Sequence, residues 1–453
     1  GWISNRKLSA DDVAASTSSS KTNDLKSNRS SLDNVLGMMR CLDVLMQWQK
    51  LQAIADDVWP RLDPSTRQHV APTLALATWG LGKWEQMRRF TDLMDSSTAK
   101  ASFYKAVIAI HDGRLEAARG HVNRSRMLIA DGLTPLLAES YNRAYPSMVM
   151  VQNLAELDEI ITLRKLVADG KNLEAEDYRY HLERTWRRRI SGCQQSVDVW
   201  SRILQVRSLL VPPGQERNVA HHSRGLGTQG TQKSVWVKFA SLCRKSERFA
   251  LSMKTLLQLG ACSPSESNMP HMKRLLADAS SVGVQMITLN RNSAPKPAVR
   301  YALYKHAWAV GSREEAVMLL DRFVTEMENK TAPGHDDINL RVRCHIKLGQ
   351  YRMALAADQG RYMSRDQDFL PAALEDFDKA RRMNANAYSA WHAWAKMNFD
   401  AAQYYQKQGK HNMCMKYVLP AVDGFFRSIG LARSSKQKQV MSNLLEDILR
   451  LLT

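Results

Sequence analysis

Clustered basic residues are the feature of this sequence that most clearly suggests chemistry. Helical spacing would place Lys238 and Lys245 two turns apart on one face, and Arg343 and Lys347, at i and i+4, on another. Converging lysine and arginine side chains could hold a polyphosphate anion, whereas a solvated basic face is the plainer interpretation. Basic residues cluster in two stretches: Arg184, Arg187, Arg188 and Arg189 on one short helix, and Lys238, Arg244, Lys245 and Arg248 on another hairpin.

The other motifs that could carry out chemistry lack the neighbouring sequence that such a function requires. Gly225-Leu-Gly227-Thr-Gln-Gly230 matches a dinucleotide loop, but no strand precedes it, so we interpret it as a chance match. His221-His222 has no cysteine or carboxylate at ligand spacing, which favours a solvated pair over a metal site. Asp376-Phe377-Asp378 is not the metal-binding Asp-Phe-Gly of protein kinases. We therefore predict no catalytic residue and no metal site.

Composition narrows the class of protein. The chain has 453 residues, of which 44% are hydrophobic and 24% charged, so bulk disorder is excluded. The 64 Lys+Arg and 45 Asp+Glu leave a net charge of +19, which raises nucleic acid as a partner. No nucleic-acid-binding module is present and acids interleave with the bases, so we expect no nucleic acid. No apolar run is long enough for a transmembrane segment, and six dispersed cysteines without a Cys-x-x-Cys pair favour a reducing compartment.

The elements that must position these residues are helices. Apolar residues recur at spacings of three and four along Leu36 to Val206, and strand-like alternation is nearly absent. The numerous tryptophans, such as Trp79 and Trp391, fall in these patterns and are typical of core packing between helices.

A recurring turn signature indicates how the helices are connected. A helix ends at a glycine or serine, a polar residue follows, and a second helix begins, often with alanine nearby. Between successive instances the spacing is irregular, so we predict an all-α fold, an α-solenoid of tetratricopeptide-like helical hairpins, without clean repeats. The signature occurs at Gly82, Gly113, Ser246, Gly311, Gly349 and Gly409.

Several longer stretches are recognisable. Trp391-His-Ala-Trp-Ala-Lys-Met-Asn-Phe399 resembles the FAT domain of the TOR (target of rapamycin) kinases, in the phosphatidylinositol-3-kinase-related kinase family. The resemblance covers about residues 38–453, and departs from the family at the loop near 212–234 and at the Ser-rich start. Further matching stretches are Val418–Ile429, Val199–Ser208, Ala240–Lys245, Ala77–Trp84 and Ala138–Tyr145.

This resemblance implies the organisation of the chain, with the solenoid passing into a HEAT-like segment. A start without Met and an end inside an amphipathic pattern suggest a piece of a longer polypeptide. The expected segments are a disordered Ser-rich stretch at 1–35, tetratricopeptide-like repeats at 36–206, a loop insertion at 207–234, further repeats with the basic cluster at 235–387, and a truncated HEAT-like segment at 388–453.

The resemblance also implies a function. FAT domains of this family clamp the kinase domain that follows them, so the chain is expected to be a regulatory scaffold in nutrient and growth signalling, without catalysis of its own. ATP and Mg would belong to the kinase domain. Implied partners are that kinase domain and, through the parent chain, Raptor/Rictor-type proteins and a β-propeller subunit. The implied location is cytoplasmic, with peripheral attachment at lysosomal or vacuolar membranes through the complex.

A ligand site follows from the same resemblance. The family binds inositol hexakisphosphate in this solenoid, and one further basic position of the family falls on Ala309 here, a loss that would weaken the site. The alternatives are a free-standing helical-repeat adaptor, which a downstream kinase region in the gene would exclude, and nucleic-acid binding, which a steep salt dependence would reveal. The implied ligand residues are Lys238, Lys245, Lys305, Arg343 and Lys347.

Overall fold

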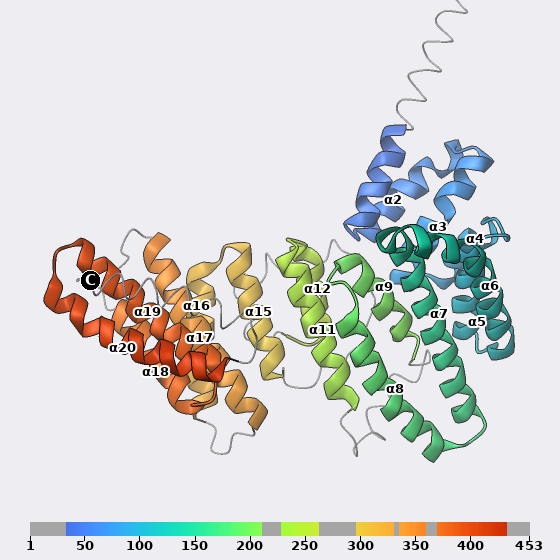
Figure 1. The fold of residues 1–453 in the computed structure, drawn as a ribbon. Coiled ribbons are helices and arrows are strands. Elements are labelled where there is room, and N and C mark those ends of the chain that lie inside the picture. Colours follow the sequence, from blue (N-terminus) through green and yellow to red (C-terminus); the bar gives the residue numbers. More distant parts are fainter. Residues whose placement is uncertain (1–32, 211–227, 262–295, 330–334, 359–368, 433–453) are drawn as a thin grey trace, which may run out of the picture. The chain divides into compact units, whose positions relative to one another are not determined.

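A computed structural model describes residues 33–210, 228–261, 296–329, 335–358 and 369–432 (Figure 1). The regular secondary structure in these ranges is helical throughout, which confirms the all-α class. The chain divides into two units, which we describe separately. Unit 1 comprises Gly1–Leu259 and Asn268–Arg291, and unit 2 comprises Gly260–Ser267 and Asn292–Thr453.

Unit 1 is a succession of helical hairpins. Residues 33–44 are helical, and an apolar core runs through the later helices, with Ile110, Leu157 and Ile160 fully buried. The further elements are α2 (Trp48–Val58), η1 (Trp59–Arg61), α3 (Pro64–Gly80), α4 (Trp84–Asp92), α5 (Ala99–His111), α6 (Leu115–Glu139), α7 (Tyr141–Ala168), α8 (Asn172–Gly192), α9 (Val197–Ser208), α11 (Thr228–Lys245) and α12 (Phe249–Gln258).

Unit 2 continues the same construction. Successive helices pack against each other, and α19 and α20 lie side by side as a long hairpin (Figure 1). Phe377 and Phe425 are buried members of apolar clusters in its described residues. The helices are α15 (Pro297–Val310), α16 (Arg313–Glu328), α17 (His335–Asp358), α18 (Phe369–Met383), α19 (Tyr388–Lys407) and α20 (His411–Leu431).

The predicted turns are confirmed at five of the six positions. Gly82, Gly113, Gly311 and Gly409 all have positive φ, between 68° and 108°, a conformation in which glycine avoids a Cβ penalty. At Ser246 the chain also turns between α11 and α12, and there Glu247 takes the positive φ, at 59°.

The turn predicted at Gly349 is wrong. Gly349 lies in the interior of α17, which runs without a break from His335 to Asp358. A Cβ at this position would lie 2.8 Å from the ring of Phe377 and 3.1 Å from the carbonyl oxygen of Ala373. The glycine is therefore explained by the close approach of α18 to α17 rather than by a helix end.

Aromatic residues pack between the helices as predicted. Trp79, Trp200, Trp236 and Trp391 are buried. Trp48 lies so close to Gly80 that a Cβ there would overlap its ring. Large rings thus fill the space between neighbouring helices at points where the backbone carries no side chain.

The second helical stretch begins earlier than the expected loop insertion allows. Helix α11 starts at Thr228, inside the 207–234 segment. Residues 228–233 contain no proline, so the backbone there is free to join the helix that follows. His221-His222 and the first glycines of the Gly225–Gly230 motif lie outside the described residues, as does the Ser-rich segment before residue 33. None of the described helices is long and apolar enough to cross a membrane.

A buried ion pair ties three helices of unit 1 together. Glu156 on α7 is fully buried, and Arg207 on α9 is only 9% exposed. Two hydrogen bonds of 2.8 and 2.7 Å join the guanidinium to the carboxylate. Arg207 also donates to the carbonyl of Trp186 on α8 at 3.1 Å, and its Cζ lies 4.9 Å from that ring's centroid.

A second charged cluster fastens the turn after α5. Asp112 accepts hydrogen bonds from Arg88 on α4 and from Arg114. The Arg88 guanidinium is the main reason that the pKa of Asp112 lies well below its usual range, with Arg114 and His111 adding to the effect and partial burial opposing it. The carboxylate therefore links α4 to the α5–α6 turn in its charged form.

Candidate anion-binding site

Three of the five predicted ligand residues lie on two contacting helices of unit 2. Lys305 lies on α15, and Arg343 and Lys347 lie one turn apart on α17. The hydroxyl of Tyr301 on α15 donates to the carbonyl oxygen of Arg343 at 3.1 Å, so the two helices are in direct contact at this level. The i, i+4 spacing of Arg343 and Lys347 gives their side chains a common face.

Both lysines lie over tyrosine rings. The Nζ of Lys305 is 4.2 Å from the centroid of Tyr301, and the Nζ of Lys347 is 5.3 Å from that of Tyr351. Tyr351 in turn stacks on Trp308 of α15, with centroids 3.9 Å apart and planes 3° from parallel. The stack of Tyr351 on Trp308 therefore joins α17 to α15 next to Lys347.

The pKa of the buried Cys344 thiol is influenced by charges on both helices. Burial raises the pKa of Cys344 to about 12, while Arg343 and Lys305 act in the opposite direction. Charges from two different helices, α15 and α17, therefore act on one sulfur atom. Their shared field is positive, which favours an anion in front of it.

The other face of α17 is anchored by a polar network. The Nδ1 of buried His345 is 3.4 Å from Oδ1 of Asp376 on α18. Arg352 donates to Asp376 at 2.8 Å and to Asp321 on α16 at 2.6 Å. These contacts fix α17 between its neighbours, and so determine where Arg343 and Lys347 emerge.

The remaining two predicted residues belong to unit 1. Lys238 and Lys245 are exposed on α11, whereas Trp236, Phe239 and Cys243 of the same helix are buried. Seven residues of α-helix rise about 10 Å, so the two ammonium groups share the solvent face two turns apart. The predicted ligand residues thus comprise a pair on α11 of unit 1 and a trio on α15 and α17 of unit 2.

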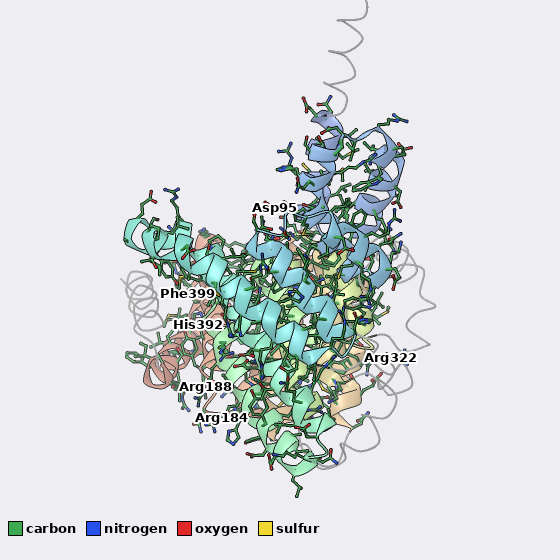
Figure 2. All side chains as sticks on the ribbon, turned by 90° about the vertical axis from the view of Figure 1, so that its right-hand side faces the viewer. Asp95, Arg184, Arg188, Arg322, His392 and Phe399 are labelled. Atoms are coloured by element: carbon green, nitrogen blue, oxygen red, sulfur yellow. The ribbon has the colours of Figure 1, made fainter. Side chains whose placement is uncertain are left out.

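Other basic residues singled out by sequence have structural partners. Arg189 makes a bidentate pair with Glu159, at 2.9 and 2.8 Å. Arg248 pairs with Asp198 at 2.9 Å and so connects the start of α12 to α9. By contrast, the exposed Arg184 and Arg188 on α8 have no ion-pair partner within the described ranges (Figure 2).

Sequence reasoning did not single out the two tyrosines. Tyr301 stands four residues before Lys305, and Tyr351 four residues after Lys347. That spacing puts each ring and its lysine on one helix face, and could have indicated the contact. The hydrogen bond from Tyr301 to the Arg343 carbonyl joins residues 42 positions apart, and had no local signal.

Comparison with known proteins identifies a family and relatives that this chain resembles in sequence. The family model described as "FAT domain" matches residues 71–453. Serine/threonine-protein kinase tor1 of Schizosaccharomyces pombe is 31% identical over 444 residues, which cover 93% of this chain and 17% of tor1. Serine/threonine-protein kinase mTor of Drosophila melanogaster is 32% identical over 458 residues, covering 95% of this chain and 16% of mTor.

Among solved structures, the crystal structure of the yeast Tom70 aligns with a TM-score of 0.30 and 10% identity, over 93% of this chain and 96% of that chain. A TM-score this low is no basis for assigning a fold or a function. The assignment of a family rests instead on the sequence matches, in which the chain spans only a small share of the length of each kinase. With the family model matched over most of its residues, the chain belongs to the FAT domain family, in the branch found in TOR serine/threonine-protein kinases.

Proposed function

We propose that this chain is the regulatory scaffold of a TOR-type serine/threonine kinase and clamps a kinase domain that follows it in the parent polypeptide. The match of residues 71–453 to the FAT domain carries this proposal, together with relatives that are serine/threonine-protein kinases. Stacked helical hairpins suit the role, because each contacts its neighbours over a long surface and can transmit strain along the array. ATP and Mg would be bound by the kinase domain.

The scaffold also binds inositol hexakisphosphate through Lys238, Lys245, Lys305, Arg343 and Lys347. The support for this ligand is chemical. Lys305, Arg343 and Lys347 present three positive groups on adjoining helix faces of unit 2, and a polyphosphate offers several anionic groups at once. Binding to the folded chain would stabilise it by mass action.

Within a larger assembly, the proposed partners are Raptor/Rictor-type proteins and a β-propeller subunit, which the parent chain would recruit. The proposed location is the cytoplasm, with peripheral attachment to lysosomal or vacuolar membranes through the complex. A free-standing adaptor is the competing proposal. Sequencing the encoding transcript beyond codon 453 separates the two, because the scaffold requires a kinase region downstream.

The ligand proposal is tested by calorimetric titration with inositol hexakisphosphate at near-physiological salt, alongside thermal unfolding. Arg343→Gln/Lys347→Gln removes two charges from the trio, and Lys238→Gln/Lys245→Gln removes the pair on α11. Arg184→Gln/Arg188→Gln is the matched control, because it removes the same net charge from an exposed face outside the set.

A specific site gives saturable binding and a thermal midpoint raised by several degrees, both lost in the first two double variants and kept in the control. Equal losses in all three variants would mean diffuse attraction to a +19 chain and would refute the site. Absence of binding in the folded wild-type chain would refute it as well.

A further inference from the structure

Lys305 and Lys347, the two predicted ligand lysines of unit 2, have the same kind of support. Each ammonium lies over the face of a tyrosine one helical turn away, and both rings are almost completely buried, Tyr301 at 7% and Tyr351 at 6% exposure. The lysine side chains, themselves half-buried, therefore lie against rings that the protein almost completely covers.

We infer that Tyr301 and Tyr351 are positioning residues of the polyphosphate site, which hold Lys305 and Lys347 extended over their rings before the anion arrives. This inference rests on the proposed inositol hexakisphosphate site and adds the residues that organise it. Neither tyrosine contacts the ligand in this scheme, because each acts through the lysine above it.

The advantage is entropic. A free lysine side chain samples many rotamers, and ordering such a chain on binding weakens association. An ammonium attracted to the face of a tyrosine ring has already lost part of that freedom. At Lys347 the ammonium also donates to Oε1 of Gln350 at 2.8 Å, which further limits the positions it can take.

Tyr301 makes a second contact, with the backbone of α17. Its hydroxyl donates to the Arg343 carbonyl at 3.1 Å, so the residue that supports Lys305 is also in contact with the α17 backbone at Arg343. Tyr351, which supports Lys347, likewise contacts the facing helix, because it stacks on Trp308 of α15. The same aromatic side chains thus contact both the facing helix and the lysines.

The test compares Tyr301→Leu, Tyr301→Phe and the wild type by calorimetric titration with inositol hexakisphosphate. Loss of the ring in Tyr301→Leu is expected to weaken binding about fivefold, whereas Tyr301→Phe keeps the ring and stays within about twofold of wild type. Tyr304→Phe is the matched control for the lost hydroxyl. Tyr304 is on the same helix but packs against Phe323, and its hydroxyl lies 3.0 Å from Arg300 Nε.

A readout without ligand separates positioning from a merely structural role. In a chain with isotope-labelled lysines, the ε-methylene protons of Lys305, assigned by their loss in Lys305→Gln, should be shifted upfield by the Tyr301 ring. The shift should disappear in Tyr301→Leu and persist in Tyr301→Phe. The ligand-free thermal midpoint shows whether each variant is folded.

Weakened binding together with the lost shift, in a folded Tyr301→Leu chain, supports the inference. Wild-type affinity in folded Tyr301→Leu overturns it and leaves the proposed site intact. A wild-type chain that shows the upfield shift but does not bind inositol hexakisphosphate refutes the proposed ligand, and with it the positioning role that rests on it.

Discussion

Removing one partner of the Glu156–Arg207 pair should destabilise unit 1 far more than removing any exposed ion pair. The carboxylate is fully buried and the guanidinium nearly so. Glu156→Ala leaves Arg207 with its hydrogen bond to the Trp186 carbonyl but without its carboxylate, and Arg207→Met leaves a carboxylate without its cation. Uncompensated buried charge of this kind costs about 3–5 kcal/mol of unfolding free energy.

Replacing both partners has a different expected result. Glu156→Leu/Arg207→Met removes both charges together and fills the space with apolar atoms. Such replacements are often close to neutral, so the double variant should lose less stability than either single variant. This ordering distinguishes a cost of unpaired charge from a simple loss of packing, which would make the double variant the least stable.

The assay is urea unfolding followed by circular dichroism. With an m-value of roughly 3 kcal/mol/M, a loss of about 3 kcal/mol moves the midpoint of unit 1 down by roughly 1 M urea. The control is Glu139→Gln, which breaks an exposed pair with Arg143, at 56% and 62% exposure, and should cost less than about 1 kcal/mol. A single variant at position 156 or 207 that unfolds like the control would refute the buried-charge reasoning.

Three further predictions follow from local geometry. Gly349→Ala should lower the thermal midpoint of unit 2, since its methyl group would press against a buried ring, whereas Gly120→Ala, in an open part of α6, should raise stability by about 0.5–1 kcal/mol through helix propensity. The pKa of Asp112 is lowered in the folded state, so its contribution to the free energy of unfolding is present above the unfolded-state pKa and is lost as pH falls through the folded-state pKa. Asp112→Asn should therefore destabilise the chain at neutral pH. The difference in unfolding free energy between variant and wild type should shrink toward pH 2. Cys344, whose pKa burial raises to about 12, should resist iodoacetamide at pH 8 while exposed Cys41 is alkylated, as mass spectrometry of the modified peptides would show; rapid alkylation at position 344 in the folded chain would contradict its burial.

The helical class, four of the glycine turns and the tryptophan cores could be predicted from the sequence because each depends on neighbours within one or two turns. A three-and-four apolar spacing indicates a helix with one buried face wherever it occurs. A glycine after such a run readily adopts the positive φ that ends it, as at Gly82 and Gly113. The shared faces of Lys238 with Lys245 and of Arg343 with Lys347 follow from the helical repeat in the same way.

What tertiary structure alone decided depends on residues far apart in the chain. Gly349 looked like a helix end, but α18 comes so close that only a glycine fits inside α17. Arg189 and Arg248 looked available for an anion, but carboxylates 30 and 50 residues away hold them. The contact of Tyr301 with Arg343 likewise exists only because hairpins stack. Local spacing sets which face a side chain occupies, whereas packing of the next helix decides what that face meets, and no periodicity encodes it.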